Sequence, residues 1–243
     1  MEKETIKICR NTEELASTFA GMLSSGIKNL ADGHHFSLAL SGGSTPKAIF
    51  QHLAADIGRD IDWSRITIFW GDERCVGPDS DESNYKMAKE NLLDLVPIPD
   101  SNIFRIMGEN DPSTEAKRYE DVIRRHLPDY NGVPNFHLIM LGLGDDGHTA
   151  SIFPDQIRLF GSSSLCVPAA NPYSGQKRVS VTGKLINHAD IVVFLATGPS
   201  KAEKVAQVIQ KREGWEMLPA ALVEPEHGEL IWLLDGPAAG KLD

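Results

Sequence analysis

Cysteine is scarce in this chain of 243 residues, and no apolar run is long enough to cross a bilayer. The three cysteines, Cys9, Cys75 and Cys166, are an odd number, lie far apart and lack the CxxC spacing of a zinc site. This usage fits a reducing compartment better than a disulfide framework. The N-terminal residues are charged, without the apolar stretch of a signal peptide. We therefore expect a cytoplasmic protein with no membrane partner.

Basic residues are also in short supply, with 24 Lys and Arg against 34 Asp and Glu, a net charge of −10. Binding to a phosphate backbone needs a positive surface, so this composition argues against nucleic acid as a partner. An anionic ligand would have to be attracted by a local pocket, because the overall field would repel it.

Several catalytic signatures are missing. The eight histidines show no HExxH pattern and, apart from His148, no context that suggests a site, so we predict no metal. There is no GxSxG elbow of a serine hydrolase. Residues 142–147 formally match GxGxxG, but no acid lies between Asp155 and Asp190, and Pro154 interrupts the helix that should follow. We therefore predict no dinucleotide and no other cofactor.

The apolar pattern predicts strands that alternate with helices. Strands are expected at 35–40, 65–70, 136–141, 178–182, 191–197 and 230–235. Helices are expected at 11–30, 46–55, 84–95, 112–127 and 200–212. Alternation of this kind indicates a single α/β domain over 1–243, with a mostly parallel, doubly wound (Rossmann-like) sheet flanked by helices. Residues 153–175 look like a long surface excursion.

Chemistry-bearing residues follow four of these strands, in the segments 41–46, 71–74, 142–148 and 198–201. Ligands of parallel sheets bind outside the carboxyl ends of the strands, so the four segments are expected to converge on one edge.

The first segment contains Gly42, Gly43, Ser44 and Thr45 before a helix that begins near Pro46. Two glycines allow close approach of main-chain N–H groups, and the helix directs its positive end to the same place. This pattern predicts phosphate or sugar binding. A tight strand-to-helix turn with a serine cap would give the same sequence.

Charged side chains in three other segments could complete such a site. Asp72 and Arg74 follow an aromatic strand end and could orient a polyol and neutralise an anion, or could be an exposed charged turn. Lys201 and Arg178 are a solvated lysine and a strand-edge charge when taken singly. Together with the glycine segment they predict a cationic pocket in an acidic protein.

Asp146-Gly147-His148 is the candidate catalytic turn. A carboxylate on Nδ1–H fixes the histidine tautomer and leaves Nε2 free as a base. Such an imidazole suits general-base work on water, although a loop histidine satisfied by a carboxylate would look the same.

The order of these segments resembles that of the 6-phosphogluconolactonase family. The resemblance is carried by LALSGGSTP (38–46), FWGDER (69–74), MLGLGDDGHTASIFP (140–154), KRVSVT (177–182) and TGPSK (197–201). It implies metal-free hydrolysis of 6-phospho-D-glucono-1,5-lactone to 6-phosphogluconate in the oxidative pentose phosphate pathway. It assigns the base to His148, a supporting role to Asp146 and substrate contact to Arg74. The phosphate and sugar would be surrounded by Gly42, Gly43, Ser44, Arg178 and Lys201.

Two alternatives share part of this pattern. The related glucosamine-6-phosphate deaminase/isomerases have an acid five residues beyond the histidine, where this chain has Phe153. Phospho-sugar sensors of similar fold need an attached DNA-binding segment, for which the pattern leaves no room. The sequence indicates neither the oligomeric state nor the oxyanion stabiliser, for which Arg74 and the glycine-loop N–H groups are candidates.

Overall fold

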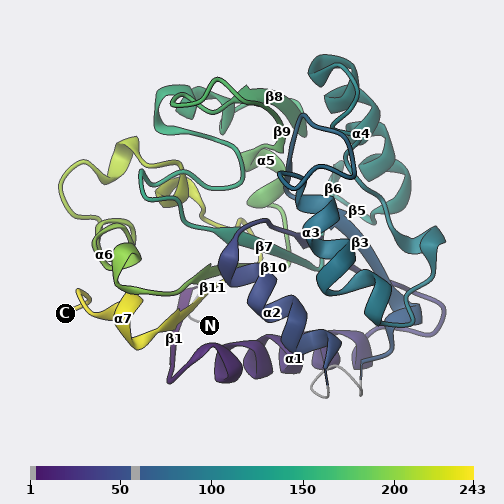
Figure 1. Cartoon of the computed structure of the whole chain (residues 1–243), viewed down its shortest axis with the longest axis horizontal. Helices are drawn as coiled ribbons and strands as arrows, with labels where there is room; N and C mark the ends of the chain where they lie inside the picture. The colour runs from purple at the N-terminus through teal and green to yellow at the C-terminus, as the bar shows by residue number, and fades with distance from the viewer. Residues whose placement is uncertain (1–3, 56–60) are drawn as a thin grey trace.

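A six-stranded parallel sheet organises the molecule (Figure 1), a computed structural model that describes residues 4–55 and 61–243. Its order across the sheet is β1, β11, β10, β7, β2, β3, and every neighbouring pair is parallel. The strands are β1 (Glu4–Cys9), β2 (Phe36–Leu40), β3 (Ile66–Trp70), β7 (Leu138–Gly142), β10 (Ile191–Ala196) and β11 (Glu229–Asp235). The predicted mostly parallel α/β fold is confirmed.

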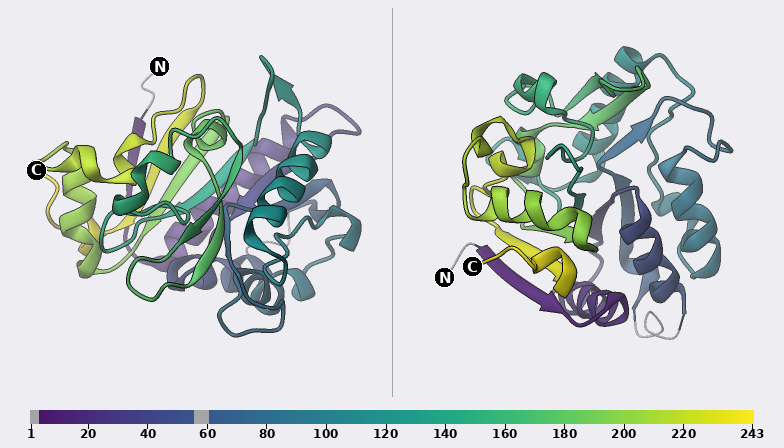
Figure 2. Two further views of the ribbon diagram at one scale, coloured as in Figure 1. Left: turned by 90° about the horizontal axis from the view of Figure 1, so that it is seen from above. Right: turned by 60° about the vertical axis from the view of Figure 1, so that its left-hand side comes forward.

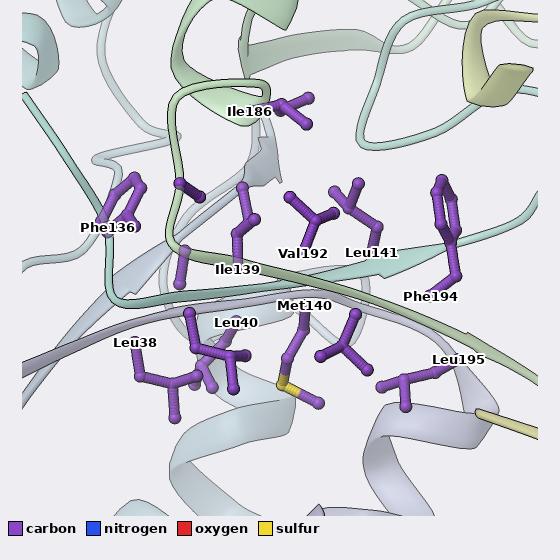
Figure 3. Packing of buried hydrophobic residues seen from close by; sticks show 14 of the residues in the cluster. Leu38, Leu40, Phe136, Ile139, Met140, Leu141, Ile186, Val192, Phe194 and Leu195 are labelled. Atoms are coloured by element: carbon purple, nitrogen blue, oxygen red, sulfur yellow. The ribbon is translucent and has the colours of Figure 1, made fainter. Parts of the chain in front are cut away.

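Both faces of the central strands of this sheet are covered, which explains why these strands are apolar throughout. In Figure 3, Ile139 and Leu141 of β7 project to one face and Met140 to the other, as the two-residue period of a strand requires. Phe194 of β10 lies on the first face and Leu195 on the second. All five residues are 2% exposed or less, so the central strands β7 and β10 have no polar face.

Helices pack around the sheets, and the five longest α-helices lie at the expected places. They are α1 (Thr12–Lys28), α2 (Ser44–Ala54), α3 (Asn84–Asn91), α4 (Pro112–His126), α5 (Gly183–Ile186), α6 (Ala202–Ile209) and α7 (Gly236–Ala239). α1 packs against α2, and α2 against α3, and Figure 1 shows α1 along the bottom of the molecule. Asn11 caps α1 by accepting a hydrogen bond from the main chain of Glu14, and Asp111 caps α4 in the same way. No helix in the described ranges is both long and apolar enough to span a membrane.

A second, antiparallel sheet was not predicted. It consists of β4 (Asp72–Arg74), β9 (Lys177–Val181) and β8 (Cys166–Ala170), and α4 packs on it. The predicted strand at 178–182 therefore lies here and not in the parallel sheet. The predicted charged turn at 72–74 is a strand, because its main chain pairs with β9.

The expectation of a surface excursion at 153–175 is also wrong for much of its length. Phe153 and Cys166 are buried, and the segment contains β8 and a 3₁₀ helix, η5 (Pro154–Leu159). Two short strands, β5 (Asp129–Tyr130) and β6 (Val133–Pro134), form a separate hairpin.

The first strand, β1, was missed because its sequence does not look buried. It is an edge strand in which only Cys9 is buried, and Ile8 is 59% exposed. Figure 2 shows it in purple along the outer edge of the sheet, beside β11. A strand with one neighbouring strand and a solvated face does not need a continuous apolar sequence.

Neighbouring strands β2 and β7 lead the chain in opposite directions across the sheet. From β2 the chain continues to β3 on one side, and from β7 it continues to β10 on the other. Their carboxyl ends therefore form a topological switch point, the usual place for a ligand in a fold of this kind.

Candidate active site

A cavity of about 280 Å³ opens at this switch point. The lining residues are Ser41, Gly42, Gly43, Asp72, Arg74, Asn84, Gly142, Leu143, Gly144, Asp145, His148, Ala150, Arg178 and Lys201. All four predicted segments contribute, and Arg178 is added from β9. A larger cavity of about 420 Å³ near Trp232 has neither histidine nor arginine in its wall.

His148 and Asp146 form a hydrogen-bonded pair in the turn that follows β7. Nδ1 of His148 lies 2.6 Å from Oδ1 of Asp146, and the main-chain N–H of His148 donates to the same oxygen at 3.0 Å. The His148 ring packs on Phe153 with centroids 4.5 Å apart. With Nδ1 bound to the carboxylate, Nε2 is the nitrogen left for substrate.

Two glycines make this pairing possible. Gly147 has φ +87°, a conformation that side chains disfavour, and it lies between the two paired residues. A Cβ on Gly144 would come within 2.1 Å of Nδ1 of His148. The His148 ring therefore packs directly against the main chain of Gly144, where any side chain would collide with it.

The Asp146 carboxyl group is ionised at any ordinary pH. Partial burial raises its pKa, but the hydrogen bonds from the ring and main chain of His148 outweigh this and lower the pKa to about 2. A permanent negative charge thus lies beside the imidazole.

The Gly42–Gly43 turn presents the N-terminus of α2 to the cavity. Gly43 has φ +109° and precedes α2, and no side chain caps the first N–H groups of this helix. A Cβ on Gly42 would lie 1.9 Å from Oδ1 of Asn84, so only glycine fits there. Ser44 is exposed and Thr45 bonds to Thr197, and neither lines the cavity.

Arg74 and Arg178 lie opposite each other on neighbouring strands of the second sheet. They are direct partners in the β4–β9 pairing, so their side chains project to the same face. Nε of each is buried, and the described part of the chain offers it no hydrogen-bond partner. Two like charges in register destabilise a sheet unless something neutralises them, and Asp72, 3.8 Å from Arg178, does so only in part.

Burial lowers the pKa of Arg178, while the Asp72 carboxylate opposes that effect. Lys201, from the 3₁₀ helix η6 (Pro199–Lys201), adds a third cation and binds Asp145 at 2.6 Å. The wall is therefore locally cationic, as the sequence predicts for an anionic ligand of an acidic protein.

Two residues of the site were missed by sequence reasoning. Ser151 is fully buried and donates to Asp72 at 2.5 Å, and Asn84 donates to the main-chain oxygen of Asp72 at 3.0 Å. Ala150, between His148 and Ser151, has φ +47°, an unusual value for a residue with a side chain. The contacts of Asn84 and Ser151 with Asp72 join segments 12 and 79 residues apart, so no local pattern indicates them.

Glu73, on the opposite face of β4, fixes the start of α3, which carries Asn84 of the cavity wall. Its carboxylate accepts four hydrogen bonds, from the main chain of Arg74, Asn84 and Tyr85 and from the Ser83 hydroxyl, at 2.7–2.9 Å. Burial raises the pKa of Glu73, and these donors oppose that change. The carboxylate thus ties the strand that carries Arg74 to the start of α3.

Among residues 4–55 and 61–243, no group of three or more histidine, cysteine, aspartate and glutamate side chains is arranged to hold a metal ion. The donors at the cavity are hydroxyl, amide, guanidinium, ammonium and imidazole groups, with two carboxylates already paired to cations. This set is suited to a polyhydroxylated anion.

Comparison with known proteins identifies similar chains. The family model described as glucosamine-6-phosphate isomerases/6-phosphogluconolactonase matches residues 10–232. A 6-phosphogluconolactonase of Treponema pallidum is 43% identical, over 82% of this chain and 83% of its own. One of Haemophilus influenzae is 42% identical, over 86% and 88%. The crystal structure of a devB protein superposes with a TM-score of 0.91 at 39% identity, over 99% and 100% of the two chains.

Proposed function

The chain belongs to the family of glucosamine-6-phosphate isomerases and 6-phosphogluconolactonases, and on that premise we propose that His148 is the general base of a lactone hydrolysis. The chain is an enzyme, a lactone hydrolase that converts 6-phospho-D-glucono-1,5-lactone to 6-phosphogluconate in the pentose phosphate pathway. The observation that carries the assignment of the base is the His148–Asp146 pair in the wall that also contains Arg74 and Arg178.

The reaction needs only one proton shuttle. Nε2 of His148 takes a proton from water as the water oxygen bonds to the lactone carbonyl carbon. When the tetrahedral intermediate collapses, the bond from that carbon to the ring oxygen breaks, and His148 returns its proton to the ring oxygen. The Asp146 carboxylate stabilises the imidazolium between the two steps.

The substrate phosphate lies between Arg74 and Arg178 in this proposal. Both guanidinium groups line the cavity and supply charge-assisted hydrogen bonds in the geometry that phosphate oxygens accept. An anion there also removes the repulsion between the two cross-strand cations. Lys201 and the hydroxyl of Ser41 contact the sugar.

The oxyanion is assigned to the main-chain N–H groups at Gly43 and the start of α2. Gly43 lies in the cavity wall at the N-terminus of this helix, where the first N–H groups have no partner within the helix, whereas Arg74 is committed to the phosphate. The side chains of Ser44 and Thr45 do not line the cavity, and the Thr45 hydroxyl bonds to Thr197 instead.

Phe153 argues against the deaminase alternative. At the position where that activity needs an acid, a buried phenyl ring packs on His148 and cannot transfer a proton. A sensor without turnover would not require an imidazole whose second nitrogen is free. We also propose that the enzyme works in the cytoplasm without metal or cofactor, in line with its three free thiols.

An assay with freshly generated lactone tests this function. Acid release should exceed the spontaneous rate by several orders of magnitude, and EDTA should leave it unchanged. Glucosamine 6-phosphate, supplied in parallel, should release no ammonia. Hydrolysis at the spontaneous rate, or ammonia release, would refute the proposal.

A further inference from the structure

Tyr173 is an exposed aromatic residue on a rigid turn at the edge of the site. It lies at the tip of the β8–β9 hairpin, and 79% of it is exposed. The turn is ordered by the Asn171 side chain, which accepts hydrogen bonds from the main chain of Tyr173 and Ser174 at 2.9 and 3.1 Å. Burial of the ring does not explain this ordered turn, because Tyr173 faces solvent.

The hairpin is fixed at both ends to elements of the active site. Gln156 exchanges two hydrogen bonds with the main chain of Ala170, which joins the hairpin to the segment that follows His148 and Phe153. Gln176 donates to Glu82, whose main-chain oxygen accepts from Arg74. The tip is thus held beside the cavity and is not a free loop.

One oxygen of the Asp146 carboxylate lacks a hydrogen-bond donor, and the Tyr173 hydroxyl can provide one. Oδ1 of Asp146 accepts both hydrogen bonds from His148, whereas Oδ2 is buried and no group in the described ranges meets the geometry of a hydrogen bond to it. A buried carboxylate oxygen without a donor is costly. The negative charge of Asp146 is the main cause that raises the pKa of Tyr173, and the two side chains approach hydrogen-bonding contact, so the phenol lies beside this carboxylate.

We propose that Tyr173 is a positioning residue for the dyad: with substrate bound, its hydroxyl donates to Oδ2 of Asp146. Tyr173, Asp146 and His148 then form one hydrogen-bonded chain, in which the carboxylate is held from both sides and directed at Nδ1. This inference rests on the proposed hydrolysis, because it assigns Tyr173 a part in that reaction.

Tyr173→Phe removes the hydroxyl and keeps the ring. We expect kcat on the lactone to fall about tenfold, the size of one hydrogen bond to a charged group, while KM changes less than about twofold. Without the donor, Asp146 presents more negative charge to the imidazolium. The acid limb of the rate profile should therefore move to higher pH, which a merely structural role would not cause.

Two comparisons isolate the effect. Tyr130→Phe alters a half-exposed tyrosine of the separate β5–β6 hairpin, whose ring packs on His188 and His227, and should change nothing. In an Asp146→Ala background, Tyr173→Phe should cost less than about twofold, because its target is gone. Wild-type kcat and pH profile in Tyr173→Phe, or an undiminished loss in the Asp146→Ala background, would overturn the inference.

A titration that needs no turnover separates this inference from the proposed function. In protein with ¹³C-labelled tyrosine, Asp146→Asn should lower the pH at which Tyr173 ionises, because the charge that raises its pKa is removed. An unchanged midpoint would overturn the contact. If the wild-type protein does not accelerate lactone hydrolysis, the proposed function fails, and the titration still decides whether Tyr173 and Asp146 interact.

Discussion

Asp146 shows at the scale of a single residue how the fold prepares the site. Its carboxyl group is 18% exposed, yet its pKa is about 2 because His148 donates to it twice. The same contact that orients the imidazole for catalysis therefore also stabilises the folded state. Function and stability are coupled here and should respond together to pH.

This coupling predicts a pH-dependent contribution to stability. A folded pKa of about 2 against an ordinary 3.8 is a depression, so the stabilisation is present above about pH 4 and is lost as pH falls toward 2. Its full size is about 2 kcal/mol, from 1.36 kcal/mol per unit. Urea unfolding should show Asp146→Asn less stable than wild type by this amount near pH 6, and the difference should shrink near pH 3.

His148→Ala is the control, since the protein without the imidazole should lose most of that pH dependence. A difference between wild type and Asp146→Asn that stays constant from about pH 6 to about pH 3 would contradict the assignment.

The residues that the sequence indicates most clearly are those whose partners are nearby in the chain. His148 and Asp146 are two positions apart, and their pairing follows from a glycine turn. Ser44 and Thr45 were included for their hydroxyl groups, yet the helix start directs these away from the cavity. Glu73 and Ser151 depend on contacts that only the folded chain creates, so composition and spacing do not reveal them.

At the scale of elements, the short strand β4 connects both sides of the site through the two-residue period of a strand. Asp72 and Arg74 project to the cavity face, and Glu73 projects to the opposite face, where it binds the start of α3. A charged segment that looks like a turn in the sequence is therefore a strand whose two faces have separate tasks.

Glu73→Gln tests this arrangement. All four groups that contact the carboxylate are donors, so a glutamine must turn its NH₂ group toward some of them. We expect a loss of about 2–3 kcal/mol in the free energy of unfolding, measured with urea, and a raised KM because Asn84 and Arg74 shift. The exposed Glu213→Gln is the matched control. A loss below about 0.5 kcal/mol would show that Glu73 anchors nothing.

The elements that escaped prediction share a physical reason. β1 is an edge strand with one solvated face, and β8 has an exposed proline, Pro168, so neither shows the apolar run of a central strand. Strands β3, β7 and β10 are buried on both faces, and their apolar sequences identified them correctly.

At the scale of the whole molecule, the parallel sheet brings distant segments to one edge. Residues 41–43, 142–148 and 201 meet at the carboxyl ends of β2, β7 and β10, as the general rule for open α/β sheets predicts. The second sheet adds Arg178, which the rule does not predict. A chain of net charge −10 thereby gathers three cations around one cavity.

The most direct test of this account is the activity of His148→Ala on 6-phosphogluconolactone, with calorimetric binding of 6-phosphogluconate measured on the same protein. The catalysed rate should fall by at least about 10²-fold, the usual contribution of a general base, while the Kd of the product changes only a few-fold. His126→Ala, which alters an exposed histidine of α4, should behave as wild type. Turnover near the wild-type rate in His148→Ala would contradict the account.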